Sequence, residues 1–200
     1  MKVKKYLLLF LIVFSVSCEK ETFTPNNYLK ATINGNPFIV YQDNRLNNDT
    51  TPNTFNFSFG QITSKNADTC LFLSVCLNRN NLHISFPKPT GNTTYTIYRQ
   101  SNISGQASAF YSRVPKYAKE TGLETFCTQN ILNIKSHEGQ PIGEIIIDNI
   151  DTKSRLIEGH FSFSAYGYQV TSTETCVPTN NVIGITNGEF RYQWNESLSL

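Results

Sequence analysis

Apolar residues recur at every second position through most of this chain, starting at Tyr28. The alternation is seen first in Leu29, Ala31 and Ile33, which polar residues separate. It returns over 71–77 and 82–86, and no window keeps apolar residues three and four positions apart as a helix would. Alternation places apolar side chains on one face of a strand. The sequence therefore predicts an all-β fold, an antiparallel β-sandwich of about eleven short strands or, alternatively, a closed or partly open β-barrel.

Short turns rich in Asn and Gly join the expected strands. Asn34-Gly35-Asn36 predicts a first hairpin, and the polar residues 78–81 predict a second one. Asn187-Gly188 predicts a bulge in the last strand. Other strands are expected at 55–59, 95–98, 107–112, 156–165 and 182–194, with 131–135 pairing to 143–149 across Gly139. Long loops are expected at 114–130, with at most one helical turn, and at 169–181.

The N-terminus has the features of an export signal. Three lysines within residues 1–5 precede an apolar run over 6–14, which is shorter than the roughly 20 residues that span a bilayer. Small residues precede Cys18, as in a bacterial lipobox, so we expect cleavage there and acylation of Cys18; ordinary secretion with cleavage nearby is the alternative. The chain thus divides into a signal peptide (1–17), a lipidated N-terminus with a flexible tether (18–27), one all-β domain (28–195) and a C-terminal tail (196–200).

The tether is polar and is interrupted by Pro25. Its acidic, lysine-containing start resembles the surface-export signal of Bacteroidota lipoproteins. We therefore expect a protein anchored by lipid to the outer membrane, facing either the periplasm or the outside of the cell.

Net charge argues against nucleic acid as a partner. The full chain carries 17 Lys+Arg against 15 Asp+Glu, and removal of the signal peptide would leave 14 against 15. A surplus of basic residues supplies most of the affinity for nucleic acids, and this chain lacks one.

Four cysteines remain once Cys18 is assigned to the lipid. An even number in an exported protein favours disulfides over a metal site. Cys70 and Cys76 would lie about 20 Å apart on one strand, too far for a bridge between them. Either Cys127 and Cys176 pair with each other, or each pairs with one strand cysteine, which we favour. A zinc site of four thiolates is a further alternative, although no C-x2-C spacing occurs.

The sequence shows no catalytic or metal-binding signature. It lacks H-x-H, HExxH, G-x-S-x-G and phosphate-binding glycine motifs. The three histidines, His83, His137 and His160, are expected to be solvated, and no pair of carboxylates stands out as a glycosidase pair. We predict no cofactor, no metal and no catalytic residue.

Two short polar motifs invite a functional interpretation. Asp148, Asp151 and Ser154 could suggest a calcium loop, but the EF-hand spacing is missing, and a hairpin turn explains them better. Asp49-Thr50-Thr51 resembles the O-glycosylation signal of Bacteroidota.

Aromatic residues could form a ligand-binding surface. Phe190, Tyr192 and Trp194 share one strand phase, which favours a place in the core. Tyr166 and Tyr168 flank Gly167 and lead into an expected loop, so they are the better candidates for an exposed binding platform.

Several runs resemble one family. They are 145–151 (IIIDNID), 159–165 (GHFSFSA) and 185–190 (ITNGEF), together with 31–35 (ATING) and the stretch 91–97. These runs resemble small Bacteroidota lipoproteins that share a β-rich domain of unknown function. The resemblance implies a lipid-anchored β module and assigns no catalytic residue. The four cysteines and the long loops depart from the family's plainer pattern.

These observations favour a non-enzymatic lipoprotein of the outer membrane or cell surface that binds a protein or glycan partner through its loops. A hydrolase acting on envelope or external polymers is one alternative. A structural subunit of an outer-membrane assembly, joined through an unpaired edge strand, is the other.

Overall fold

The structure is a computed structural model that describes residues 27–42, 56–63, 69–77, 79–99, 106–113, 124–128, 138–170 and 176–194. These residues form eleven strands and no helix. The strands are β1 (Tyr28–Ile33), β2 (Asn36–Tyr41), β3 (Asn56–Thr63), β4 (Thr69–Leu77), β5 (Asn80–Pro87), β6 (Thr93–Arg99), β7 (Ser108–Arg113), β8 (Glu124–Cys127), β9 (Gln140–Asp151), β10 (Leu156–Val170) and β11 (Cys176–Gln193).

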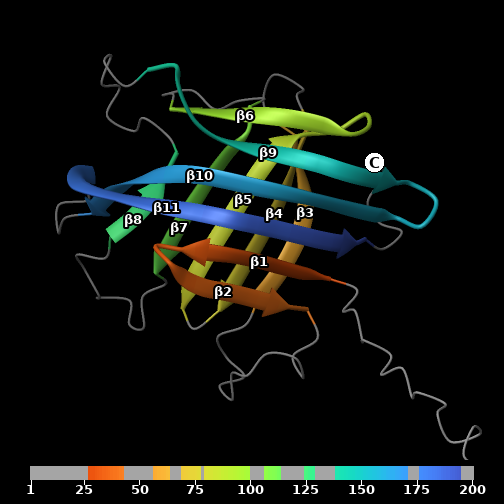
Figure 1. Ribbon diagram of the computed structural model, residues 1–200, viewed down its shortest axis with the longest axis horizontal. Helices are drawn as coiled ribbons and strands as arrows, with labels where there is room; N and C mark the ends of the chain where they lie inside the picture. Colours follow the sequence, from red (N-terminus) through yellow and green to blue (C-terminus); the bar gives the residue numbers. More distant parts are fainter. Residues whose placement is uncertain are drawn as a thin grey trace, which may run out of the picture.

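All the strand pairs are antiparallel and belong to one open sheet. The main path runs β2-β1-β11-β10-β8-β7-β5-β4-β3, and β9 with β6 branches from the first half of β10. The sheet folds over itself, so that β3, β4, β5 and β7 cross behind β1 and the long strands β9, β10 and β11 at a steep angle (Figure 1). This confirms the predicted all-β class and is consistent with a sandwich or an open barrel.

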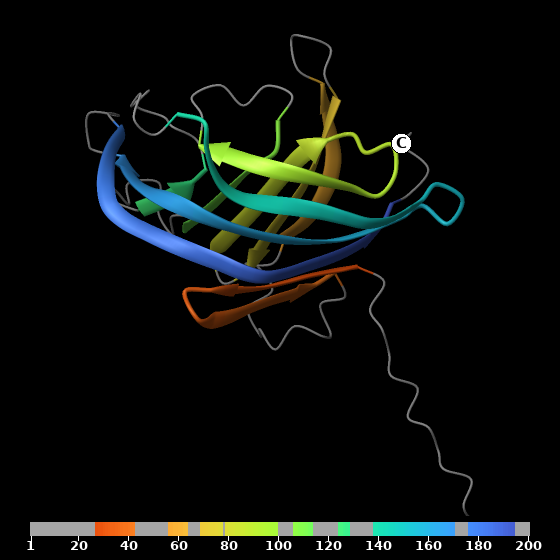
Figure 2. The same ribbon diagram turned by 45° about the horizontal axis from the view of Figure 1, so that its top comes forward.

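The core lies between these two layers. Phe86 of β5 in the rear layer stacks on Tyr95 of β6 and on Phe190 of β11, with ring centroids 6.0 Å apart in both pairs. The turned view shows the long front strands curving over the shorter rear strands (Figure 2). The buried residues follow the predicted alternation, for example Leu71, Leu73 and Val75 on β4.

Both predicted hairpins are confirmed. Asn34 and Gly35 adopt positive φ angles of 47° and 80° between β1 and β2, as a two-residue hairpin turn requires. β4 pairs with β5 across a turn in which Arg79 has a φ of 67°.

The predicted bulge at Asn187-Gly188 is also confirmed. Phe161 pairs with Gly188 and Phe163 pairs with Ile185, so β11 carries an extra residue between these two pairs. Asn187 has a positive φ of 50°, which Asn tolerates better than most residues.

Three expectations were wrong. The supposed loop 114–130 contains strand β8, which pairs with β7 and β10. The supposed loop 169–181 is largely strand, because β10 and β11 stay paired as far as Val170 and Cys176. Residues 143–147 do not pair with 131–135, because β6 and β10 occupy both edges of β9 there. Residues 131–135 themselves lie outside the described part of the chain.

Candidate functional site

A polar cleft of 540 Å³ opens at the end of the domain where β1 begins and β11 ends. Its wall is formed by three separate parts of the chain: the start and end of the β1–β2 hairpin, the turn between β9 and β10, and the last residues of β11. The residues that line the cleft are three with side-chain amides, two cations, one serine, one tyrosine and one tryptophan.

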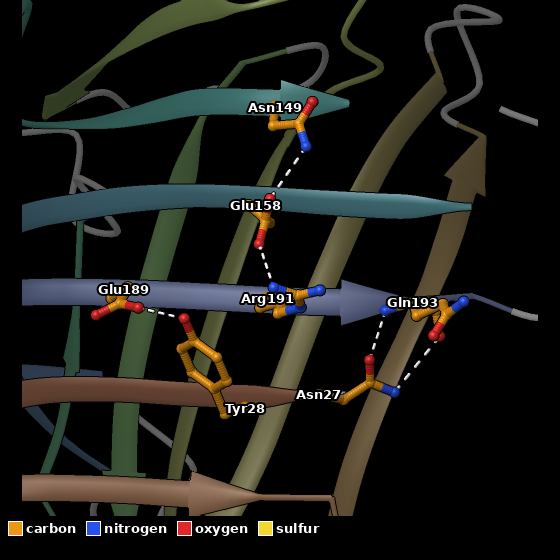
Figure 3. Close-up of polar contacts among 7 residues, drawn as sticks. All are labelled: Asn27, Tyr28, Asn149, Glu158, Glu189, Arg191 and Gln193. Carbon is orange, nitrogen blue, oxygen red and sulfur yellow. Dashed lines mark hydrogen bonds and ion pairs between the residues drawn. The ribbon is translucent and has the colours of Figure 1, made fainter. Parts of the chain in front are cut away.

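Asn27 fastens the first strand to the last one and forms one side of the cleft. Its Oδ1 accepts a hydrogen bond of 2.5 Å from the backbone N–H of Gln193, and its Nδ2 donates to the Gln193 carbonyl at 3.4 Å (Figure 3). Nδ2 also donates to Oε1 of Gln42, whose backbone N–H donates back to the Asn27 carbonyl at 3.0 Å. Asn27, Gln42 and Gln193, the three residues that contribute amides to the cleft, are therefore joined by hydrogen bonds through Asn27.

The β9–β10 turn forms the opposite side. Asp151 accepts hydrogen bonds from the backbone N–H groups of Lys153 and Ser154 and from the Ser154 hydroxyl, at 2.8, 3.3 and 2.7 Å. These bonds hold the pKa of Asp151 below its ordinary value. The hairpin interpretation of Asp151 and Ser154 is confirmed, because the Asp151 oxygens bond to the turn itself.

The turn is joined to β11 through its backbone. Arg155 has a positive φ of 58°, and its carbonyl accepts a hydrogen bond of 2.9 Å from the Trp194 N–H. The Ser154 carbonyl accepts a bond of 3.1 Å from Nε2 of Gln193. Lys153 and Arg155 are thereby placed at the cleft.

The aromatic lining belongs to the core, as predicted. Phe190, Tyr192 and Trp194 all lie among the buried residues, and Trp194 is 4% exposed. Burial raises the pKa of the Tyr192 hydroxyl. Tyr192 and Trp194 therefore form the floor of the cleft and are not an exposed stacking surface.

The described charged residues of the cleft are both cations. Lys153 and Arg155 are its charged lining residues, and no carboxylate belongs to the described lining. Asp151, the carboxylate nearest to Lys153 along the chain, is bonded to the turn itself. Gln42 and Gln193 each use only one end of the side-chain amide in these bonds, so the site suits a ligand that has hydroxyl groups for these amides and negative charge for the cations.

A second polar group crosses the outer face of the front layer (Figure 3). Arg191 donates to Glu158 at 2.9 Å, and Glu158 also accepts a bond of 3.0 Å from Asn149. The Tyr28 hydroxyl donates to Glu189; burial, together with this acidic acceptor, raises the pKa of Tyr28. Since the carboxylates of Glu158 and Glu189 are bonded across neighbouring strands, this group joins the strands of the sheet.

The two described histidines differ from each other. His160 is exposed, as predicted, and its Nδ1 lies 2.5 Å from Oδ2 of Asp148. His83 is on the outward phase, but the prediction that it is solvated was wrong. Its ring stacks between Phe72 and Phe110, at centroid distances of 5.6 and 4.9 Å, and burial lowers its pKa.

The expected exposed platform of Tyr166 and Tyr168 is not formed. Tyr168 is 2% exposed. The guanidinium of Arg99 lies over the Tyr166 ring, 3.4 Å from its centroid. The reason is that β10 continues through both tyrosines and pairs there with β8, where a loop was expected.

The predicted disulfides are not formed at Cys70, Cys76 or Cys127. β7 and β5 lie between β8 and β4, so Cys127 is about 14 Å from β4 at roughly 4.8 Å per strand. A bridge requires a Cα separation below about 7 Å. Cys70 and Cys76 do lie on one face of one strand, which is why they cannot pair with each other. The side chain of Cys176 is outside the described set.

Several candidate residues fall in parts of the chain that the structure does not describe. They are Cys18, His137 and Asp49-Thr50-Thr51. In the described ranges, no cluster of three or more His, Cys, Asp or Glu residues could hold a metal ion. The same residues include no helix with the length and apolar character needed to cross a bilayer.

Sequence patterns did not reveal the cleft, because Asn27, Gln42 and Lys153 belong to no motif. Comparison of the chain with protein-family models, with curated proteins and with solved structures finds no match.

Proposed function

We propose that this protein is a lipid-anchored lipoprotein of the outer membrane, facing the periplasm or the cell exterior, and that it binds an anionic, hydroxyl-rich ligand such as an acidic glycan. The observation that carries the proposed ligand is the lining of the cleft, which combines three amides with Lys153 and Arg155 and contains no described carboxylate. Amides bond hydroxyl groups, and cations bind carboxylate or sulfate groups.

The proposed anchor comes from the N-terminal signal and from Cys18. Asn27 is bonded to Gln42 and Gln193, so eight residues, 19–26, separate Cys18 from the first bonded residue of the folded body. An extended chain of this length reaches roughly 30 Å. The tether would therefore hold the cleft near the membrane, since Asn27 is both its last residue and part of the cleft wall.

The cleft supports binding over hydrolysis as its role. A hydrolase needs an acid–base pair or an activated nucleophile beside the substrate. The described His–carboxylate pair, Asp148 and His160, lies on the exposed face of β9 and β10. Neither residue lines the cleft.

Lys153 provides a test of the ligand class. We expect oligogalacturonate to bind the protein, and neutral maltooligosaccharide of equal length to bind at least tenfold more weakly. Lys153→Ala should weaken oligogalacturonate binding by about tenfold, because it removes one charge-assisted contact. Calorimetric titration measures all three affinities. Lys88→Ala removes an exposed lysine that does not line the cleft and should leave the affinity unchanged. Equal binding of the acidic and neutral sugars would contradict an anionic ligand.

Cys18 provides a test of the anchor. We expect the full-length protein to incorporate labelled fatty acid and to sediment with membranes, because acyl chains on one cysteine hold a protein at a bilayer. Cys18→Ala should remove the label and release the protein from the membrane fraction. An unlabelled full-length protein would refute the proposed anchor and would leave the proposed ligand binding by the cleft unaffected.

A further inference from the structure

A buried arginine that forms no ion pair with any described residue lies at the end of β6. Arg99 is 6% exposed. The ion pairs of the described residues join His160 to Asp148 and Arg191 to Glu158, and Arg99 takes part in neither. Its Nε is buried and has no hydrogen-bond partner. A buried charge in this condition is costly, and proteins normally compensate it with an anion.

The Tyr166 ring satisfies only one face of this guanidinium. Cζ of Arg99 lies 3.4 Å from the ring centroid, a separation at which the planar guanidinium has to lie flat on the ring. This stacking contributes less than the desolvation of a full charge costs. It also leaves the N–H groups at the edge of the guanidinium directed outward in a plane parallel to the ring, in which a carboxylate can bind.

Arg99 sits beside a fork in the sheet. The last pair of β10 with β9 joins Phe163 to Gly143, and the first pair of β10 with β8 joins Tyr166 to Cys127. Between them, Ser164 and Ala165 pair only with β11 among the described strands. Successive residues direct their N–H and C=O groups to opposite edges of a strand, so one of these two presents its backbone groups to the fork.

We propose that Arg99 binds the carboxylate of a small organic acid at this fork. One guanidinium and one carboxylate form a neutral, bidentate pair, whereas a phosphate dianion would leave uncompensated negative charge in a buried place. The site is separate from the cleft, since Arg155 precedes β10 and Tyr166 lies ten residues after its start. The inference does not depend on the proposed function.

The test uses the full-length chain with Cys18→Ala and sodium acetate as the probe, against sodium chloride and sodium phosphate at equal ionic strength. We expect acetate to shift the NMR signal of the Arg99 Nε–H saturably and to raise the thermal unfolding temperature. Arg99→Gln should weaken acetate binding at least tenfold. Arg99→Lys, which keeps the charge and loses the bidentate geometry, should bind with intermediate affinity. Arg191→Gln, at the arginine already paired with Glu158, should bind acetate as the parent does.

Three results would overturn the proposal. The first is an Arg99 Nε–H signal that acetate does not shift saturably, which is measured on the unsubstituted arginine and so stands even if Arg99→Gln fails to fold. The second is an equal response to phosphate or chloride, which would mark a general effect of salt. The third is an experimental structure in which a carboxylate of the chain itself is bonded to Arg99.

Discussion

Two glycines of β11 have opposite surroundings. A Cβ built on Gly188 would lie 2.4 Å from the Phe161 carbonyl oxygen and 2.5 Å from the Phe161 ring, whereas a Cβ on Gly184 meets nothing within 4 Å. Gly188 is therefore required for the close approach of β10, and Gly184 is not.

We expect Gly188→Ala to destabilise the domain by about 1–3 kcal/mol, the usual cost of overpacking. Gly184→Ala is the matched control, and it should be neutral or stabilise by up to about 1 kcal/mol, because alanine has less backbone freedom to lose than glycine. Urea denaturation measures both values. Equal losses of stability in the two variants would contradict the claim that Gly188 is required for the close approach of β10.

At the scale of elements, a row of stacked rings crosses β4, β5 and β7 on the outer side of the rear layer. His83 is its middle member, between Phe72 and Phe110. Burial lowers the pKa of His83 below 6.5. Above pH 6.5 the imidazole is neutral in both the folded and the unfolded chain. Below it the unfolded chain takes up a proton that the folded chain resists, so this row loses stability as the pH falls.

Replacement of His83 by a residue that cannot titrate removes this dependence. We expect His83→Phe to gain stability relative to the parent as the pH is lowered from 7 to 5, as measured by urea denaturation at each pH. NMR titration of the parent should give a His83 midpoint below 6.5. A midpoint at or above 6.5 would mean that the ring is solvated.

Local patterns predicted elements well where alternation is long. β1, β4 and β5 were expected because apolar and polar residues alternate within each strand. The hairpin at Asn34-Gly35 was expected because Asn and Gly tolerate positive φ angles. β8 was missed because four residues, Glu124–Cys127, are too few to show a period. Because β8 was not expected, its pairing with β10 at Tyr168 was not expected either, and the burial of Tyr168 could not be predicted.

At the scale of the whole molecule, the first two strands complete the core. Leu29 and Val40 are fully buried, and Ala31, Ile33 and Phe38 are at most 8% exposed. Burial of such side chains contributes about 1.5–3 kcal/mol for each large one. The sum is comparable with the entire stability of a typical domain, about 5–15 kcal/mol.

Two truncations follow from this arithmetic. Removal of residues 1–26 should leave the unfolding free energy unchanged, because we expect these residues to be a signal peptide and a polar tether outside the folded domain. Removal of residues 1–42 should give an unfolded or aggregated product, since the edge of β11 that pairs with β1 would be exposed. Circular dichroism and size-exclusion chromatography distinguish these outcomes, and a monomeric folded product of the longer truncation would contradict this role of the hairpin.

The two proposed binding sites could be recognised only from the whole fold. The cleft joins residues near 27, 42, 153 and 193, and no local spacing connects such distant positions. Arg99 shares the inward phase of Tyr95 and Ile97 on β6, but alternation alone does not indicate that a charged residue at the end of a strand is buried. Both sites depend on how one sheet folds back on itself, which periodicity does not specify.

The bonding of Asn27 to Gln193 also has a mechanical consequence. Force applied to the segment before Asn27 acts on the N-terminal end of β1. This strand is hydrogen-bonded along both edges, to β2 and to β11. The force is therefore distributed over β2 and β11, and it does not act on an edge strand that is paired on one side only. If the proposed tether carries load, this attachment would distribute the force over several strands.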